Sequence, residues 1–161
     1  MIKYVDTLVS FSEVPDEISL CINISNCPCK CEGCHSSYLA EDIGDLLTVF
    51  ELTKLIRKNK GITCVAFLGG DSNPRYINSL AIWVKTTFPE LKVAWYSGRQ
   101  EISDKIDLQY FNYVKVGPYI KDRGPLTDRN TNQKMYKVIP FVDWNGQWCG
   151  QLTDITFKFW K

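Results

Sequence analysis

The stretch "EISLCINISNCPCKCEGCH", Glu17–His35, joins two patterns that together indicate the fold. Over 17–25, apolar residues alternate with polar or small ones, which predicts a β-strand with one packed face and one small, polar face. Four cysteines and the chain's only histidine follow within 27–35. The strand therefore leads directly into a cysteine-rich loop.

Strands and helices alternate beyond that loop. Apolar runs rich in β-branched and aromatic residues predict further strands over 62–68, 91–97 and 110–116. Helices are expected from Thr48, which has capping-box spacing to Glu51, and from the Asn73-Pro74 pair, with a short, poorly patterned helix over 103–106. Such alternation predicts parallel βα units with right-handed crossovers.

The length limits how far this pattern can extend. At 161 residues the chain is shorter than the roughly 250 residues typical of a closed eight-unit barrel. We therefore expect an α/β fold, a partial, open (βα) barrel with a mostly parallel sheet. A single domain should span 1–161, with a core over about 17–140, a closing strand at 136–142, and an aromatic tail over 141–161 that mostly packs on the domain.

Composition favours some classes of protein over others. A net charge of +1 gives no global field for nucleic acid or an anionic membrane, so neither is an expected partner. The N-terminal residues lack the apolar core of a signal peptide, and no window approaches the roughly 20 apolar residues of a membrane span. We expect a cytoplasmic protein, in which clustered cysteines indicate a metal or redox site before disulfides.

Unusual sequence features follow each predicted strand. After the cysteine loop come Gly69-Gly70-Asp71, Ser97-Gly98 and Gly117-Pro118-Tyr119. In a parallel arrangement these positions share the edge where α/β folds bind ligands. Gly-Gly-Asp alone is also typical of an ordinary turn, but its position opposite the cysteines favours a glycine-lined cleft.

The cysteine spacing favours one kind of metal site. Cys27, Cys31 and Cys34 form C-x3-C-x2-C, with Cys29 as an extra thiol. A structural zinc site usually has a second, separate pair of ligands, and adjacent Cys34 and His35 would converge on one ion with difficulty. Three thiolates on a 4Fe-4S cluster leave one iron open for a substrate or cofactor. A non-enzymatic iron-sulfur or zinc-binding module remains an alternative.

These residues resemble the radical S-adenosylmethionine (SAM) superfamily, which shares the cysteine spacing and a Gly-Gly-acid motif after the second strand. The ordered blocks "NCPCKCEGCH", "FLGGD", "WYSGR", "VGPY" and "TNQKMY" are similar to the activating proteins of anaerobic ribonucleoside-triphosphate reductases. The resemblance extends from the first predicted strand to about Tyr136. Activases of other glycyl-radical enzymes, and other small radical SAM enzymes, are the alternatives.

The resemblance implies a mechanism and partners. Cys27, Cys31 and Cys34 would hold a 4Fe-4S cluster whose fourth iron binds SAM. One-electron reduction of SAM, supplied through a donor such as flavodoxin or ferredoxin, would give methionine and a 5′-deoxyadenosyl radical. That radical would remove a hydrogen atom from a glycine on the large catalytic subunit of the reductase.

The resemblance also implies which residues bind SAM. Gly69, Gly70 and Asp71 would line its methionine amino end, and Ser97 and Gly98 would lie near its ribose. Asp71 stands where much of the superfamily has Glu, so its reach is shorter. Many members carry an aromatic residue at the position of Gly33. His35 is the candidate for that contact with adenine, and a histidine that only hydrogen-bonds within the loop is the alternative.

The other cysteines and the late polar segment receive simpler interpretations. Cys64 is expected to be a buried apolar residue, and Cys21 to pack or to border the cleft. No role is assigned to Cys29 or Cys149. The polar loop over 121–134, which includes Asn132 and Gln133, is the candidate surface for the partner protein.

Overall fold

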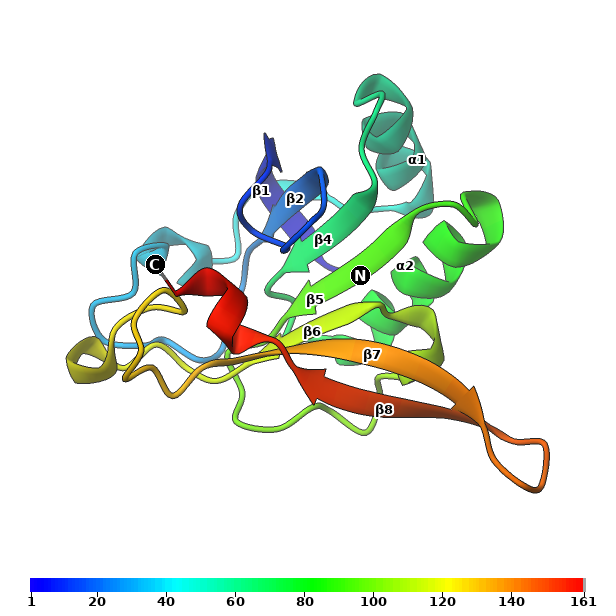
Figure 1. The fold of residues 1–161 in the computed structure, drawn as a ribbon. Helices are drawn as coiled ribbons and strands as arrows, with labels where there is room; N and C mark the ends of the chain where they lie inside the picture. The colour runs from blue at the N-terminus through cyan, green and yellow to red at the C-terminus, as the bar shows by residue number, and fades with distance from the viewer. Residues whose placement is uncertain (161) are drawn as a thin grey trace.

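The computed structural model of the chain describes residues 1–160, which form one eight-stranded sheet and two α-helices (Figure 1). The strands lie in the order β3-β1-β2-β4-β5-β6-β7-β8. Their bounds are β1 Lys3–Ser10, β2 Ser19–Ile24, β3 Asp45–Leu46, β4 Cys64–Leu68, β5 Lys92–Tyr96, β6 Tyr113–Val116, β7 Lys134–Val142 and β8 Trp148–Asp154. The helices are α1 Val49–Lys58 and α2 Pro74–Thr87, with short 3-10 helices at Ser37–Ala40, Leu108–Tyr110, Lys121–Arg123 and Thr156–Phe159.

Parallel pairing is confined to the centre of the sheet. β2, β4, β5 and β6 pair parallel, as the alternating sequence pattern predicts. Antiparallel strands flank them, β1 and β3 on one side and β7 and β8 on the other. The mostly parallel sheet that we expected is thus corrected to a mixed one. The sheet is open, with β3 and β8 at its edges, and the assignment to a radical SAM type of partial barrel stays a prediction.

Three flanking strands were not foreseen, and the short edge strand β3 is one of them. β1 pairs with β2 ahead of the expected core, and β8 forms a hairpin with β7. The hairpin turn contains Asn145-Gly146, a strong hairpin signal, and Gly146 has a φ of +78°. The expected helix over 103–106 is wrong: that stretch is a turn, and a 3-10 helix follows where the Asp107 side chain accepts a hydrogen bond from the Gln109 N–H.

The C-terminal aromatic residues do not pack as we expected. Trp144, at the hairpin tip, is 93% exposed, and Phe157 and Trp160 are also exposed. Trp148 packs against the main core and Phe159 against a second one. Most of the tail's aromatic surface therefore faces solvent, although its backbone belongs to the sheet.

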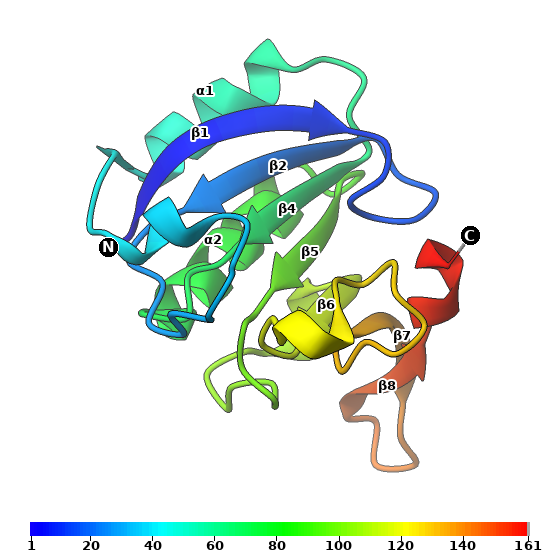
Figure 2. The ribbon, with the colours of Figure 1, turned by 90° about the vertical axis from the view of Figure 1, so that its left-hand side faces the viewer.

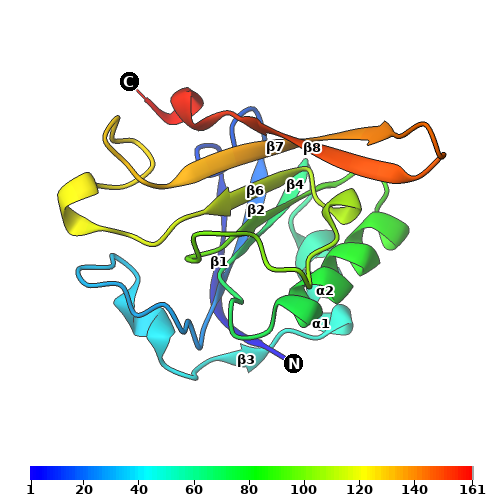
Figure 3. The same ribbon diagram turned by 90° about the horizontal axis from the view of Figure 1, so that it is seen from below.

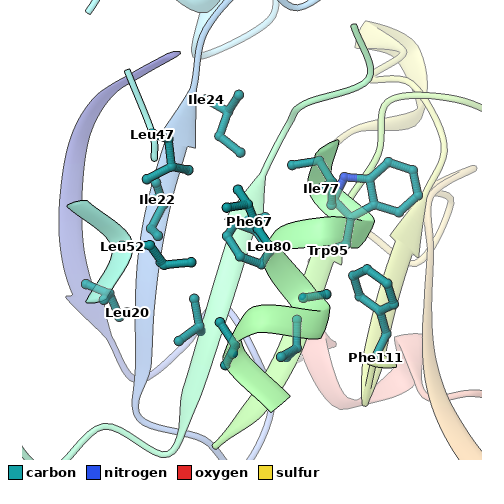
Figure 4. Packing of buried hydrophobic residues seen from close by; sticks show 14 of the residues in the cluster. Leu20, Ile22, Ile24, Leu47, Leu52, Phe67, Ile77, Leu80, Trp95 and Phe111 are labelled. Atoms are coloured by element: carbon teal, nitrogen blue, oxygen red, sulfur yellow. The ribbon is translucent and has the colours of Figure 1, made fainter. Parts of the chain in front are cut away.

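Both α-helices cover the same side of the sheet (Figures 2 and 3). As predicted, each begins at a side-chain cap: Thr48 accepts a hydrogen bond from the Glu51 N–H, and Asn73 from the Tyr76 N–H. Their apolar stripes pack on the strands to form the main core (Figure 4). The central residues of this core are Leu20, Ile22, Ile24, Leu47, Leu52, Phe67, Ile77, Leu80 and Trp95.

The opposite side of the sheet carries a second, smaller core. Cys21, Cys64, Ala66 and Ala94 contribute to it, covered by residues such as Val14, Leu126 and Ile155 from outside the central strands. Cys64 is fully buried, which confirms the prediction for it. Cys21 is also fully buried, so the small, polar face expected for its strand is wrong: β2 is covered on both sides. Burial raises the pKa of Cys21 to about 12, and that of Cys64 still further.

A buried carboxylate joins the amino ends of the parallel strands. Glu17 accepts hydrogen bonds from Lys92 Nζ at 2.5 Å, Thr63 Oγ1 at 2.6 Å and Tyr113 OH at 2.7 Å. These residues stand just before or at the start of β2, β4, β5 and β6. The network therefore fixes one end of the strands and leaves the carboxyl ends to form a site.

The described part of the chain contains no helix with the length and apolar character that a membrane crossing requires.

Candidate functional site

The segments that follow the four parallel strands meet around one cavity of about 270 Å³. Figure 3 shows the loop after β2 and the segment after β6 at the same end of the sheet. The predicted site residues that line the cavity are Cys27, Cys31, Cys34, Gly69, Asp71, Ser97 and Gly98. The structure thus brings together most of the motifs that the sequence placed after separate strands.

Three of the four cysteines in the loop share one backbone feature. Asn26, Lys30 and Gly33 have φ values of 58°, 44° and 71°, in the left-handed region that few residues other than glycine adopt. Each directly precedes one of the cysteines of the C-x3-C-x2-C motif. Cys29 instead follows Pro28. The loop therefore turns before each predicted ligand and does not turn this way before the extra thiol.

A second cavity also separates Cys29 from the other three cysteines of the loop. Cys27, Cys31 and Cys34 also line a space of about 250 Å³ inside the loop, to which Cys29 does not contribute. Backbone hydrogen bonds close this loop: the Asn26 N–H donates to Glu41 O at 2.9 Å, and the Cys27 N–H to Leu39 O at 2.8 Å. All four thiols are free and partly exposed.

The donor set fits an iron-sulfur cluster. Thiolates are the usual ligands of such clusters, and a cluster carries them on separate irons, so they need not converge on one point. Among residues 1–160, no three His, Cys, Asp or Glu side chains converge closely enough to hold a single metal ion. Three thiols around one shared cavity match the kind of ligands that a 4Fe-4S cluster uses.

Asp71 is the centre of a hydrogen-bonded group at the cavity wall. Its carboxylate is buried and accepts from Ser97 Oγ at 2.6 Å and from the Gly98 N–H at 2.8 Å. The Cys29 thiol lies 3.9 Å from Asp71 Oδ2, and a Cβ on Gly98 would stand 2.7 Å from Cys29 Sγ. Burial, together with the charge of Asp71, raises the pKa of Cys29 to about 12. The Cys29 thiol is therefore placed to donate a hydrogen bond to Asp71.

The two glycines before Asp71 have different surroundings. Gly69 lines the cavity with a φ of +102°, and a Cβ there would lie 3.0 Å from Ile24 O. Gly70 does not line the cavity: with a φ of +91° it packs against Ile77 of α2, 2.5 Å from where its Cβ would stand. Gly70 therefore allows close packing of helix and strand, while Gly69 lies where a ligand could contact the backbone.

His35 lies outside the main cavity. It is exposed, its Nδ1 is 3.5 Å from Ser36 Oγ, and it lines an adjoining space of about 690 Å³. That adjoining space shares part of its wall with the main cavity, including Asn23, Tyr96 and Gln133. The geometry places His35 at the adjoining space rather than among the cysteines.

The late polar segment closes one side of the cavity. Gln133 is buried and lines both spaces, and Asn132 Nδ2 donates to Pro118 O at 2.9 Å. The Asn132 Oδ1 atom is buried, and within residues 1–160 it has no hydrogen-bond partner. Tyr119 lies across Gly33, with its Cε1 3.6 Å from where a Cβ would be.

Sequence reasoning missed Lys115, which lines both spaces. Its side chain is buried in β6, and Nζ donates to Gly117 O at 2.7 Å and to Ser97 O at 3.5 Å. Burial lowers the pKa of Lys115 to about 8, against the opposing influence of Cys31 and Asp71. A lysine inside the apolar run "YVKV" just before "GPY" was the signal that could have identified it.

Comparison with known proteins gives one match. The family model described as a 4Fe-4S single cluster domain matches residues 18–135, well over half of the chain. The matched region begins just before β2, includes the cysteine loop and all four parallel strands, and ends within β7. The comparisons with curated proteins and with solved structures gave no match.

Proposed function

The chain belongs to the family of 4Fe-4S single cluster domains, and we propose that it uses its cluster to cleave SAM reductively and to activate a glycyl-radical enzyme. Membership of this family accounts for the cluster and is compatible with a redox function. The substrate and the target are the steps that we add. They are supported by the way the cysteine loop faces the motifs after β4, β5 and β6.

Cys27, Cys31 and Cys34 are the proposed cluster ligands. The single observation that carries the proposal is that these three thiols, and the motifs after the other three parallel strands, line the same cavity. Three protein ligands leave one of four irons without one, which gives SAM a place to bind. When bound, the cluster supplies one electron to the sulfonium of SAM.

The cavity wall offers suitable groups for an amino acid and a ribose. Asp71 already accepts two hydrogen bonds, and a carboxylate has further lone pairs with which to bind the ammonium of SAM. Gly69 presents backbone where a side chain would collide with β2. Ser97 and Gly98 hold Asp71 in place and adjoin the same space. In this proposal they position SAM rather than react with it.

The target that we propose is a glycine on the large catalytic subunit of an anaerobic ribonucleoside-triphosphate reductase. A glycine within a folded partner has to be delivered as a loop. The adjoining space of about 690 Å³, which shares Tyr96, Lys115 and Gln133 with the cavity, offers room beside the SAM site. The electron donor in this proposal is a small low-potential protein such as flavodoxin or ferredoxin.

A second candidate is an electron-transfer module with four cysteine ligands, and Cys29 is the observation that favours it. Its thiol lines the same cavity as the other three. However, the Cys29 thiol contacts Asp71, and Cys29, unlike the other three cysteines, does not line the second cavity inside the loop. We therefore prefer the open-iron proposal.

The test is an anaerobic assay of the reconstituted, reduced protein with SAM, with and without the candidate reductase. We expect methionine and 5′-deoxyadenosine in equal amounts, and a glycyl radical signal in electron paramagnetic resonance (EPR) only when the reductase is present. Cys149→Ala, in β8 and away from the loop, is the matched control for cysteine variants. A loaded cluster that leaves SAM intact would rule out the enzyme, and SAM cleavage without a radical on the reductase would rule out that target.

A further inference from the structure

Lys115 is a buried cation that forms no ion pair within the described part of the chain. It is 8% exposed, and it is the only buried lysine or arginine among residues 1–160. None of the six ion pairs found in that part of the chain includes it. Its acceptors are the carbonyl oxygens of Ser97 and Gly117, which carry only partial charge.

Such a position is costly unless something opposes the charge. An ammonium group has three donors, and only two acceptors within the described residues contact Lys115. Burying a charge without a counter-charge carries a large desolvation penalty. Lys115 lines the cysteine cavity and the adjoining space. Its third N–H donor and its charge are therefore placed to interact with a ligand bound in these spaces.

The residues of the cavity wall indicate the sign of the occupant's charge. Cys27, Cys31 and Cys34 line it together with Asp71. An iron-sulfur cluster held by three thiolates has a net negative charge, and each electron that it accepts adds to that charge. A fixed cation in a site shielded from water stabilises the more negative state, since Coulomb interactions strengthen as the dielectric constant falls.

We propose that Lys115 is the counter-ion of the cluster and raises its reduction potential. The inference rests on the proposed cluster ligands and assigns to this chain a residue that controls how readily an external one-electron donor reduces the cluster. Lys115 acts through its charge and position, because it belongs to β6 and lines the same cavity as the cysteine loop. It requires no contact with SAM.

The test is a redox titration of the reconstituted protein without SAM, followed by EPR at pH 7. Lys115→Met keeps the length of the side chain and removes its charge, whereas Lys115→Arg keeps the charge. Lys137→Met is the matched control, since Lys137 is an exposed lysine on the neighbouring strand β7. Iron and sulfide contents and circular dichroism establish that each variant is folded and loaded.

We expect the reduction equilibrium of Lys115→Met to fall by about tenfold or more, which is about 59 mV for one electron, with Lys115→Arg and Lys137→Met close to wild type. Equal potentials for Lys115→Met and Lys137→Met would overturn the inference. If Lys115→Met folds without holding a cluster, Lys115→Gln gives the same comparison. Loss of the cluster from both neutral variants, with loading kept in Lys115→Arg, would support the counter-ion role.

This result is independent of the proposed enzyme activity. The titration contains no SAM, so it reports only on the electrostatic environment of the cluster. Failure of the wild-type protein to cleave SAM would remove the proposed function and leave the titration unaffected. An unchanged potential in Lys115→Met would remove the counter-ion and leave the SAM assay unaffected.

Discussion

Asp71 and Lys115 are the two buried charged residues at the cavity, and their surroundings differ. Asp71 is held by Ser97 and Gly98, so its carboxylate has partners before any ligand binds. Lys115 has only carbonyl oxygens. The cavity therefore combines a preorganised carboxylate with a lysine that forms no ion pair within the described residues.

The first prediction at this scale separates the ligand cysteines from Cys29. Cys31→Ala should lose most of its reconstituted iron and the absorption of the cluster, because it removes one of three proposed ligands. Cys29→Ala should keep both, because the Cys29 thiol contacts Asp71 and does not line the second cavity that the other three cysteines share. Iron and sulfide analysis after anaerobic reconstitution measures the difference. Equal losses in the two variants would favour a cluster with four cysteine ligands.

The second prediction concerns the stability cost of Lys115. Without a cluster, Lys115→Met should be more stable than wild type at pH 7, by about 1–4 kcal/mol, because an uncompensated buried charge is removed. Chemical unfolding of the cluster-free proteins under reducing conditions measures this difference. A less stable variant would show that Lys115 contributes to folding rather than to the site.

The stability advantage of Lys115→Met over wild type should depend on pH. The pKa of Lys115 is about 8 in the folded protein and about 10.4 in an unfolded chain. Between these values the unfolded state binds more protons, so the contribution of Lys115 to stability becomes less unfavourable as pH rises. The advantage of Lys115→Met should be full below pH 8 and should decline above it.

Among the elements, the Glu17 network has the clearest structural consequence. Glu17→Gln should destabilise the protein by about 2–3 kcal/mol, because it weakens charge-assisted hydrogen bonds from Lys92, Thr63 and Tyr113. Asp16→Asn is the control, since Asp16 is an exposed neighbour paired with Lys158 on the surface, and this substitution should have a much smaller effect on stability. Equal effects in urea unfolding would contradict a special role for the network.

Acid should remove this stabilisation. Burial of Glu17 acts to raise its pKa, but the hydrogen bonds from Lys92, Thr63 and Tyr113 outweigh it, and the pKa is lowered. A lowered folded pKa means that the stabilisation is full above the ordinary glutamate value and is lost as pH falls through the folded one. Wild type and Glu17→Gln should therefore approach equal stability in acid.

The β7–β8 hairpin gives a prediction about its two tryptophans. Trp144→Ser should change the free energy of unfolding by less than about 0.5 kcal/mol, because the ring is 93% exposed. Trp148→Ser should cost about 2–4 kcal/mol, because this ring packs against the main core. Thermal unfolding of the two variants checks the difference, and a large effect of Trp144 would mean that the hairpin tip packs on the domain.

The sequence predicted the elements that have strong local signals. Thr48, Asn73 and Pro74 marked the helix starts, and the apolar runs marked the central strands. β1 and β8 were missed because these outer strands bury few residues and have weak patterns. Their antiparallel pairing depends on contacts between strands rather than on any one of them. The hairpin could have been found from Asn145-Gly146.

At the scale of the whole molecule, the two ends of the parallel strands have different roles. A hydrogen-bond network joins their amino ends, and the loops at their carboxyl ends surround the cavity. The Glu17 network joins the amino ends, and the two cores fill both sides of the sheet. The carboxyl ends are left to the cysteine loop and its opposing motifs. The meeting of these motifs follows from parallel topology, which is why the sequence could anticipate it.

Other features of the site could be recognised only in the folded structure. The apolar run around Lys115 was a signal in the sequence, but its burial follows from the position of its strand between β5 and β7. The different positions of Gly69 and Gly70 depend on where α2 packs, and the distance of His35 from the main cavity depends on the path of the loop. Sequence spacing gave the residue types, whereas packing determined which of them face the same space.

The open iron is the central claim, and Mössbauer spectroscopy of protein reconstituted with iron-57 tests it most directly. With three cysteine ligands, adding SAM should shift the signal of about a quarter of the cluster iron and leave the rest unchanged. Cys29→Ala should give the same result. A fully loaded cluster whose four irons are all unaffected by SAM would contradict the account.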